Sequence, residues 1–382
     1  MQFAEVIAKN LLHRKTRAAL TMGGLALAVM AMATLLSVAW GFANSAAAYY
    51  QARNVDIVAV RAGVSDRLTS TLRFDLGDRL KALPQIADVD ASLTEVVSIG
   101  EGSLFGVPLR GLNLHGFAVG QLQITAGKPL TPEEHGQILL GVELADAVHK
   151  QAGDSLEVEG RSFTVAGIFS TTNPLESNSL CASLADVQSL MDRPQEVSEF
   201  QIRVSPTVRS DADLRTLCQE IENLRGSDRQ PLGLKALPTR QFVDSATETK
   251  LAKSMAWGTS AIVLVLSWIG MLNTMLMSVL ERTREIGILR AIGWKRSRIV
   301  RMILGESFIL CFAAAIAGLL AAWAVLSVLS RWSVTRTLVS PGLSSTAVVG
   351  GLAIVLLAGG LGALYPALRG ANISPTEALR YD

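Results

Sequence analysis

Apolar positions run in long unbroken stretches towards both ends of the chain, whereas apolar and polar positions alternate in its middle. Four windows of 35, 27, 24 and 32 residues contain no Asp, Glu, Lys or Arg: Ala18–Ala52, Ser254–Leu280, Ser307–Ser330 and Thr337–Leu368. A membrane-spanning helix needs about 20 predominantly apolar residues. Each window is long enough, so the pattern predicts membrane helices near residues 18–42, 256–280, 306–330 and 346–366.

The first window has a second interpretation, a cleavable signal peptide, because basic residues precede it and the alanine-rich stretch Ala43–Ala48 follows. The apolar region of a signal peptide is about 7–15 residues long, and Leu20–Phe42 is longer. We therefore expect a retained membrane helix. N-terminal sequencing of the mature chain would decide between the two.

The composition agrees with a mixed protein. The chain of 382 residues is 49% hydrophobic and 18% charged, and its mean hydropathy is +0.35. Outside the four windows, 264 residues carry all 68 charged side chains, about 26%, which is close to the content of about 25% in soluble domains. A single water-soluble globule is excluded. Membrane lipids are expected partners of the apolar windows, and no nucleic acid is expected.

The basic residues predict the orientation of the helices. Short cytoplasmic loops carry an excess of Lys and Arg. Residues 1–17 contain four such side chains, the loop between the second and third spans contains seven, and the loop before the fourth span contains only Arg331 and Arg336. We therefore expect both termini and the second loop to be cytoplasmic, in a multi-pass membrane protein. The segment 43–253 then lies outside, in the periplasm or extracellular space.

The external segment contains two strand–helix–strand patterns that are far apart in sequence. The first covers Val55–Arg61, Asp75–Leu83 and Val89–Ile99, and the second covers Glu199–Val204, Asp211–Leu224 and Leu232–Leu237. Two such units predict a split α/β sandwich of the ferredoxin type. Short strands and glycine turns between them predict a mostly β lobe inserted at about 103–183. The fold class is therefore an α-helical membrane protein with four transmembrane helices and a large extracytoplasmic α+β domain.

Candidate chemistry is sparse. The chain has no G-x-x-x-x-G-K-[ST] phosphate-binding loop, no H-E-x-x-H, no C-x-x-C and no G-x-S-x-G, and its four histidines are scattered. We expect no catalytic residue, no metal site and no directly bound cofactor. A membrane-anchored enzyme with its site in 43–253 is the least favoured alternative. The external cysteines Cys181 and Cys218 form either a disulfide or buried free thiols, which the sequence leaves open.

Two polar residues stand out near the membrane interface. Asn273 lies in the inner half of the second span and Glu306 at the inner start of the third. A polar group inside a membrane is a functional candidate by default. The depth of Glu306 is shallow, so we expect a structural ion pair between it and an arginine.

The most informative segment is the loop between the second and third spans, Leu280–Glu306, which we call the connector. Its pattern predicts two helices around a break at Gly293. The first covers about 282–292, with Ile286, Leu289 and Ile292 on one face, and the second continues from Ser297 into the third span.

The order of residues in the connector resembles a known family. The run Asn273–Gly293 is similar to the signature of MacB/FtsX-type ABC transporter permeases. Three further stretches agree: the basic run Lys9–Arg17 before the first span, the segment Gly136–Phe169 within the periplasmic core domain, and the C-terminal Tyr365–Ala367 followed by Ser374–Arg380. The resemblance covers nearly the whole chain.

The resemblance implies a permease subunit that works by mechanotransmission. In this mechanism a cytoplasmic ABC ATPase binds ATP and Mg²⁺, and its movement passes through the membrane helices to the external domains. The connector then acts as a coupling helix on the ATPase. Its candidate coupling residues are Glu281, Arg282, Arg284, Glu285, Ile286, Gly287, Leu289, Arg290 and Gly293. The charged ones are suited to charge-assisted contacts with a polar groove, and Ile286 and Leu289 to an apolar anchor.

The resemblance also implies partners and alternatives. Because the chain begins 17 residues before the first span, we expect a separate ATPase subunit. We also expect a second permease copy, and we favour a homodimer over a heterodimer. A periplasmic adaptor and an outer-membrane channel are possible further partners. The expected activity is export or extraction of an amphiphilic, peptide or lipid-linked substrate. The alternatives are an FtsX-like relay that moves no cargo and a lipoprotein-releasing permease.

These inferences give a complete division of the chain. By residue number it is 1–17 for a cytoplasmic amphipathic helix, 18–50 for the first span and its stalk, 51–240 for the MacB-like core domain, 241–280 for a second stalk and span, 281–301 for the coupling region, 302–330 for the third span, 331–345 for a short external loop, 346–368 for the fourth span and 369–382 for a cytoplasmic tail.

Overall fold

The computed structural model describes residues 15–64, 67–100, 104–171, 173–208, 210–226, 229–330 and 345–373. The basic N-terminal motif up to residue 14, most of the predicted external loop 331–345 and the C-terminal motif 374–380 lie outside these ranges. The chain divides into two compact units. Among the described residues, 15–41, 252–330 and 345–373 form the helical unit, and those of Phe42–Leu251 form the α/β domain.

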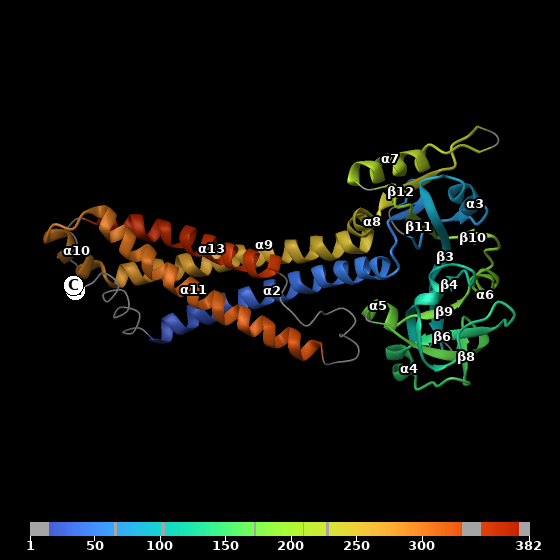
Figure 1. The fold of residues 1–382 in the computed structure, drawn as a ribbon. Helices are drawn as coiled ribbons and strands as arrows, with labels where there is room; N and C mark the ends of the chain where they lie inside the picture. The colour runs from blue at the N-terminus through green and yellow to red at the C-terminus, as the bar shows by residue number, and fades with distance from the viewer. Residues whose placement is uncertain are drawn as a thin grey trace. The chain divides into compact units, whose positions relative to one another are not determined.

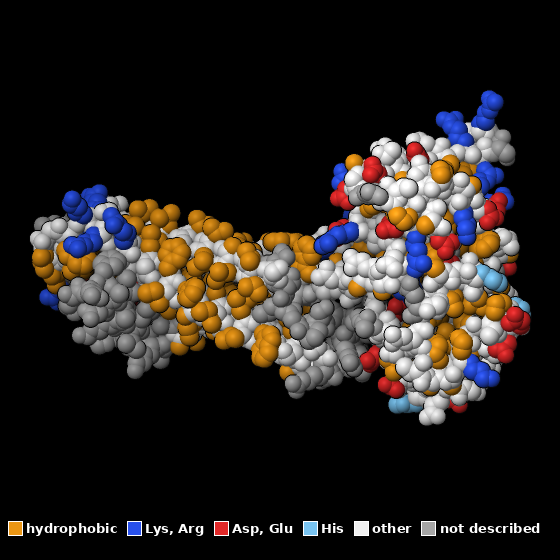
Figure 2. All heavy atoms as spheres, viewed as in Figure 1, with side chains coloured by type: hydrophobic (Ala, Val, Ile, Leu, Met, Phe, Trp, Pro, Cys, Tyr) orange, Lys and Arg blue, Asp and Glu red, His pale blue; other side chains and the backbone are white. Residues whose placement is uncertain are grey.

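The helical unit is built from four long apolar helices that run side by side (Figure 1). They are α2 (Lys15–Ala52), α9 (Thr247–Glu281), α11 (Arg296–Leu329) and α13 (Ser345–Ala371). Within the described residues, all four are long and apolar enough to cross a membrane. Hydrophobic side chains cover much of their visible surface (Figure 2). The four predicted spans are therefore confirmed as helices, and each helix extends beyond the apolar window that predicted it.

Small residues let these helices approach closely. A side chain added at Gly318 of α11 would place its Cβ 2.5 Å from the backbone oxygen of Ala26 in α2, and one at Gly359 of α13 would collide with the sulfur of Cys311. Such contacts replace the hydrophobic effect as the source of helix association in lipid. Helix α9 is the least covered of the four: 17% of its apolar window is buried, against 39–44% for the others.

The α/β domain begins with the predicted ferredoxin-like arrangement, here called the first lobe. Its strands lie in the order β12-β1-β11-β3, and every neighbouring pair is antiparallel. Helix α3 connects β1 to β3 and helix α7 connects β11 to β12, so two split strand–helix–strand units interlock. The bounds are β1 Ile57–Arg61, α3 Leu76–Lys81, β3 Ile86–Ile99, β11 Glu199–Val204, α7 Asp211–Glu222 and β12 Leu234–Pro238.

The segment between β3 and β11 forms the inserted lobe. It consists of β4 Leu104–Leu112, η1 Val119–Gln121, β5 Gln123–Gly127, β6 Gln137–Gly141, α4 Val142–Val148, β7 Ser155–Val158, β8 Arg161–Ser170, α5 Pro174–Ser177, β9 Leu180–Ser183 and α6 Leu184–Leu190. Strand β2 (Leu72–Arg73) pairs with β10 (Glu196–Val197), and α8 (Thr239–Ser245) follows β12. Parallel pairs β4–β9 and β6–β8 distinguish this lobe from the antiparallel first lobe.

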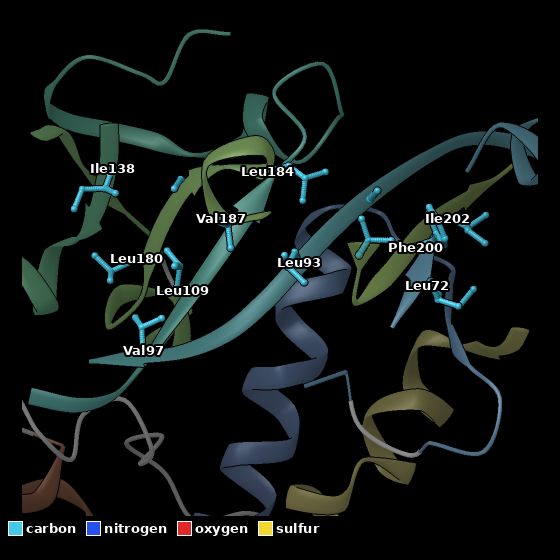
Figure 3. Close-up of a cluster of buried hydrophobic side chains, with 14 of the residues drawn as sticks. Leu72, Leu93, Val97, Leu109, Ile138, Leu180, Leu184, Val187, Phe200 and Ile202 are labelled. Carbon is cyan, nitrogen blue, oxygen red and sulfur yellow. The ribbon is translucent and has the colours of Figure 1, made fainter. Parts of the chain in front are cut away.

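The two lobes share one sheet and one core. The long strand β3 pairs with β11 on one side and with β4 on the other, so the ten strands form a continuous sheet. Leu93 and Phe200 of the first lobe belong to the same buried cluster as Leu109, Ile138 and Leu180 of the inserted lobe (Figure 3). Because the inserted lobe extends the sheet of the first lobe, the two form one folding unit at the level of the core.

All three cysteines are free and buried. Cys181 lies on β9 in a cluster with Leu139 and Phe169, whereas Cys218 lies on the apolar face of α7 in the main core. Of the two possibilities that the sequence left open, the structure therefore has buried free thiols.

Candidate functional site

The connector folds as predicted into a short surface helix between two long ones. Helix α9 ends at Glu281, α10 covers Thr283–Ala291, and α11 begins at Arg296. The backbone of Gly293 has φ = +99°, a conformation that side-chain-bearing residues rarely adopt. The break predicted at Gly293 is confirmed, and glycine is needed there for the chain to turn from α10 into α11.

One face of α10 packs against the protein itself. Ile286 is 2% exposed and Gly287 is also buried. Ile286 belongs to a buried cluster with Val279 of α9, three residues of α11 and two of α13: Ile299, Met302, Ile303, Ala367 and Ala371. Four partly buried side chains pack against this cluster: Leu289, Trp294, Val300 and Leu304. Helix α10 is therefore held by three of the long helices rather than lying loosely on them.

An ion pair fixes the start of α10. The Arg282 Nη1 donates hydrogen bonds of 2.9 and 3.2 Å to the two carboxylate oxygens of Glu306 in α11, and its Nε donates a 3.1 Å bond to Glu285. Burial alone would lower the pKa of Arg282, but the neighbouring Glu306 and Glu285 raise it above its ordinary value. The predicted pairing of Glu306 with an arginine is confirmed, and the partner is Arg282.

The outward face of α10 differs from the one that the sequence suggested. Ile288 is 43% exposed and Ile292 is 73% exposed, and Arg284 lies on the same stripe at four-residue spacing. The expectation that Ile286 is an outward apolar anchor is wrong, because its side chain fills the interior. Leu289 and Arg290 are half-buried, and Arg282 is committed to Glu306. Ile288 was missed, because its spacing from Arg284 and Ile292 becomes informative only once the buried face of α10 is known.

The remaining predicted residues lie around this face. Glu281, Glu285 and Gly293 are exposed beside the stripe. Asn273 is not part of the site: it lies on the exposed side of α9, in an open groove with Thr21 of α2 and Thr274. Lys and Arg side chains gather at the end of the helical unit where α10 lies (Figure 2). We call the exposed residues Arg284, Ile288 and Ile292 the docking stripe.

The docking stripe is suited to binding and not to bond-making. It combines cationic and apolar groups on a rigid helix, a combination typical of protein–protein contacts. Within the described residues, no group of three His, Cys, Asp or Glu side chains is placed to hold a metal ion.

Four helices that are long and apolar enough to cross a membrane, a surface connector and one large domain inserted after the first helix describe a multi-pass membrane protein. A model of the MacB-like periplasmic core domain matches residues 18–224, and a model of the FtsX-like permease C-terminal domain matches residues 257–375. The chain therefore belongs to the MacB/FtsX-type family of ABC transporter permeases.

Individual relatives agree with this assignment. The chain is 25% identical over 244 residues to the macrolide export ATP-binding/permease protein MacB of Aggregatibacter actinomycetemcomitans, which covers 60% of this chain and 37% of that protein. It is 23% identical to an uncharacterized ABC transporter permease of Methanocaldococcus jannaschii, over 82% of this chain and 80% of that one. The chain spans about half or less of the length of the MacB relatives that it matches. The solved periplasmic region of MacB from Actinobacillus actinomycetemcomitans aligns with 50% of this chain and 92% of its own at 17% identity, with a TM-score of 0.39.

Proposed function

We propose that this chain is the permease subunit of a transporter that works by mechanotransmission. A separate cytoplasmic ABC ATPase binds ATP and Mg²⁺ and seats on the docking stripe of α10. Its movement drives export or extraction of an amphiphilic, peptide or lipid-linked substrate outside the inner membrane. Both termini lie in the cytoplasm in this arrangement, and the α/β domain lies outside.

The observation that carries the proposal is the division of α10 into two faces. Its inner face is fixed to three membrane helices, while its outer face presents Arg284, Ile288 and Ile292. A force applied to the outer face therefore reaches the bundle directly. The relatives named as ATP-binding/permease proteins combine an ATP-binding part with a permease, which supports an ATPase as the occupant.

A second copy of the chain is proposed to cover α9. This helix buries the smallest share of its apolar window among the four, and it exposes large side chains such as Trp257, Ile262 and Leu266. Beside it runs an open groove lined by α2 and α9. A symmetric contact of this face with its own copy would bury both faces at once.

The test is co-purification of the ATPase from native membranes. The double substitution Ile288→Ser and Ile292→Ser, and separately Arg284→Glu, are expected to weaken retention of the ATPase about tenfold, because anchors at the centre of an interface carry most of its energy. Membrane insertion should be unchanged, since these side chains face outwards.

Two substitutions in the α/β domain provide matched controls. Phe105 is 75% exposed, close to the 73% of Ile292, and Arg215 is an exposed arginine on α7. Phe105→Ser and Arg215→Glu should retain the ATPase fully. Full retention by the α10 variants would contradict the assignment of the docking stripe.

A further inference from the structure

The last turn of α2 ends in a buried polar cluster inside the α/β domain. Helix α2 is unbroken from Lys15 to Ala52, and its final residues Tyr49 and Tyr50, with the following Arg53, are each no more than 3% exposed. We call Tyr49, Tyr50 and Arg53 the helix end. These polar side chains are buried where apolar packing is usual, so they need hydrogen-bond or ion-pair partners there.

The two tyrosines bind the first lobe. The Tyr50 hydroxyl donates a 2.9 Å hydrogen bond to Glu199 Oε2, and Gln201 Nε2 donates to the Tyr49 hydroxyl at 3.1 Å. Glu199 and Gln201 are neighbours on the same face of β11, and Gln201 Nε2 also donates a 2.8 Å bond to Glu199 Oε1. These bonds attach the helix end to the middle of the four-stranded sheet.

Arg53 binds the inserted lobe. Its guanidinium pairs with Glu176 of α5, and Arg110 of β4 donates a 2.9 Å hydrogen bond to the same carboxylate oxygen. The three side chains are only 3–5% exposed. Both guanidinium groups also lie 4.1 Å from the centre of the Tyr49 ring. Tyr49 therefore contacts both halves of the cluster.

This arrangement leaves the helix end little freedom. Buried hydrogen bonds to ionised groups are directional, and a planar guanidinium fixes the orientation of its carboxylate partner. Moving the helix end away from the inserted lobe would separate Arg53 from Glu176, and moving it away from the first lobe would remove the Tyr50 hydrogen bond from Glu199 Oε2, in a place that excludes water. The helix end can therefore be displaced only together with β11 and α5.

The other long helix connects to the domain differently. Between α8 and α9, Ala246 has extended backbone angles (φ = −57°, ψ = 139°), which interrupt the helix. No such interruption separates the body of α2 from the helix end. Of the two long helices that join the α/β domain, α2 is the one with a continuous path into the buried cluster.

We propose that the helix end is a two-way clamp through which α2 moves both lobes of the α/β domain together, with Arg53 and Glu176 positioning the inserted lobe and Tyr50 and Glu199 positioning the first lobe. This inference rests on the proposed function, since it assigns residues to the relay of ATP-driven movement. It adds to that function a specific division of labour between two sets of contacts.

The division of labour can be tested by amide hydrogen exchange. The full chain with its co-purified ATPase, reconstituted in lipid nanodiscs, is compared without nucleotide and with ATP plus vanadate. In the wild-type complex, nucleotide should change the exchange of both lobes. In Glu176→Gln the nucleotide-dependent change should fall by more than half in peptides from β4 and β9 but persist in β11. In Tyr50→Phe it should fall by more than half in β11 and persist in β4 and β9.

The readout separates positioning from mere stability. A loss of stability would speed exchange with and without nucleotide, whereas the clamp predicts a lobe-specific loss of the nucleotide response. Arg53→Lys keeps the charge but loses the planar guanidinium. It replaces Glu176→Gln if that variant does not fold, and it should reduce the nucleotide response in the same lobe, in β4 and β9. The exposed pair Arg73–Asp75 provides the control, because Asp75→Asn should leave every response at the wild-type level.

Each result is decisive. Wild-type responses in all three variants would overturn the clamp while leaving the proposed function standing. Equal loss in both lobes for each variant would overturn the division of labour. An absence of any nucleotide response in the wild-type α/β domain, with the ATPase bound and active, would instead overturn the proposed relay itself.

Discussion

The chain buries arginine–glutamate contacts in two regions, and the two are built differently. At the connector, Arg282 is shared between the buried Glu306 and Glu285, whose side chain is 68% exposed. In the α/β domain, Arg53 and Arg110 share the single carboxylate of Glu176, and all three side chains are nearly inaccessible. At the connector one guanidinium is thus shared by two carboxylates, one of them at the surface, whereas in the domain one carboxylate is shared by two guanidinium groups in the interior.

The difference matches what each region has to do. Solvent and salt screen an exposed pair, so Glu285 can exchange Arg282 for an outside partner at small cost. The interior cluster has no such alternative, since a charge that loses its partner there stays buried. In the proposed function the connector meets another protein, whereas the helix end stays attached to the α/β domain.

The largest effect is expected from removing the shared carboxylate. Glu176→Gln removes the carboxylate that both buried guanidinium groups contact, and we expect the free energy of unfolding of the α/β domain to fall by about 3–5 kcal/mol. Burial alone would raise the pKa of Glu176, but Arg110 and Arg53 hold it below its ordinary value. The contribution of Glu176 is therefore present at neutral pH and lost only when the pH falls below the ordinary carboxyl range.

Thiol labelling of the full chain in urea measures this effect within the correct unit. Cys181 and Cys218 become reactive when the α/β domain opens, and Cys311 reports on the helical unit. Burial raises the pKa of Cys181 and of Cys218 to about 11, so the folded thiols react slowly. The urea midpoint should fall for Cys181 and Cys218 and stay unchanged for Cys311. Unchanged midpoints at all three would show that the cluster is not a stabilising element.

A smaller effect is expected at the connector. Glu306→Gln leaves Arg282 only its exposed partner, and we expect α10 to lose about 2–3 kcal/mol of local stability, less than a fully buried pair would cost. Amide exchange over 283–291 should become faster by a factor of about 30–150.

Glu285→Gln is the matched control for that experiment. It removes the other carboxylate of the same arginine, but from the solvent side, so exchange over 283–291 should rise less than about threefold. Equal effects of the two substitutions would contradict the distinction between a structural and a surface carboxylate at Arg282.

The sequence predicted the helices better than the contacts between them. Helix α7, predicted at Asp211–Leu224, lies at Asp211–Glu222, because its apolar residues recur at helical spacing. The long uncharged windows identified the four apolar helices, although α9 and α11 begin well before the predicted spans at 256 and 306. The continuous sheet was not foreseen. It depends on parallel pairing of Leu109 with Leu180, which no local pattern encodes.

The same limit applies to the sites. The connector was found because its residues are adjacent in the sequence, but apolar residues occur on every side of α10, so periodicity could not separate the buried Ile286 from the exposed Ile288. The cluster at the helix end joins Arg53, Arg110 and Glu176, which are far apart in the sequence. Such a set is visible only after the chain has folded.

Another buried carboxylate sharpens the comparison, because Asp90 is as deeply buried as Glu176 but forms no ion pair with an arginine among the described residues. Asp90 of β3 is 2% exposed and accepts a 2.9 Å hydrogen bond from the backbone amide of Ala118. Burial raises its pKa from 3.8 to about 6, although backbone amides of Ala118 and Ala91 act in the opposite direction. The loop that contains Gly116 packs tightly on Asp90, since any side chain at Gly116 would collide with the Asp90 carboxylate.

A smaller effect than at Glu176 or Glu306 is therefore expected from Asp90→Asn, and its sign is opposite to that of Glu176→Gln. Between the ordinary and the raised pKa, the folded state holds a proton that the unfolded state releases, so wild-type stability falls as the pH rises through this range. Asparagine has no carboxyl group that must ionise inside the folded domain. We therefore expect the variant to be about 1–2 kcal/mol more stable than the wild type above about pH 7 and no more stable than it near pH 4. Amide exchange in β3 is measured for the variant and the wild type at each pH, and the ratio of the two rates reports the difference in stability. Because both rates are taken at the same pH, the ratio cancels the intrinsic pH dependence of exchange. A ratio that does not change with pH would show that Asp90 is ionised as readily in the folded domain as in the unfolded chain, and that burial without an arginine costs this carboxylate nothing.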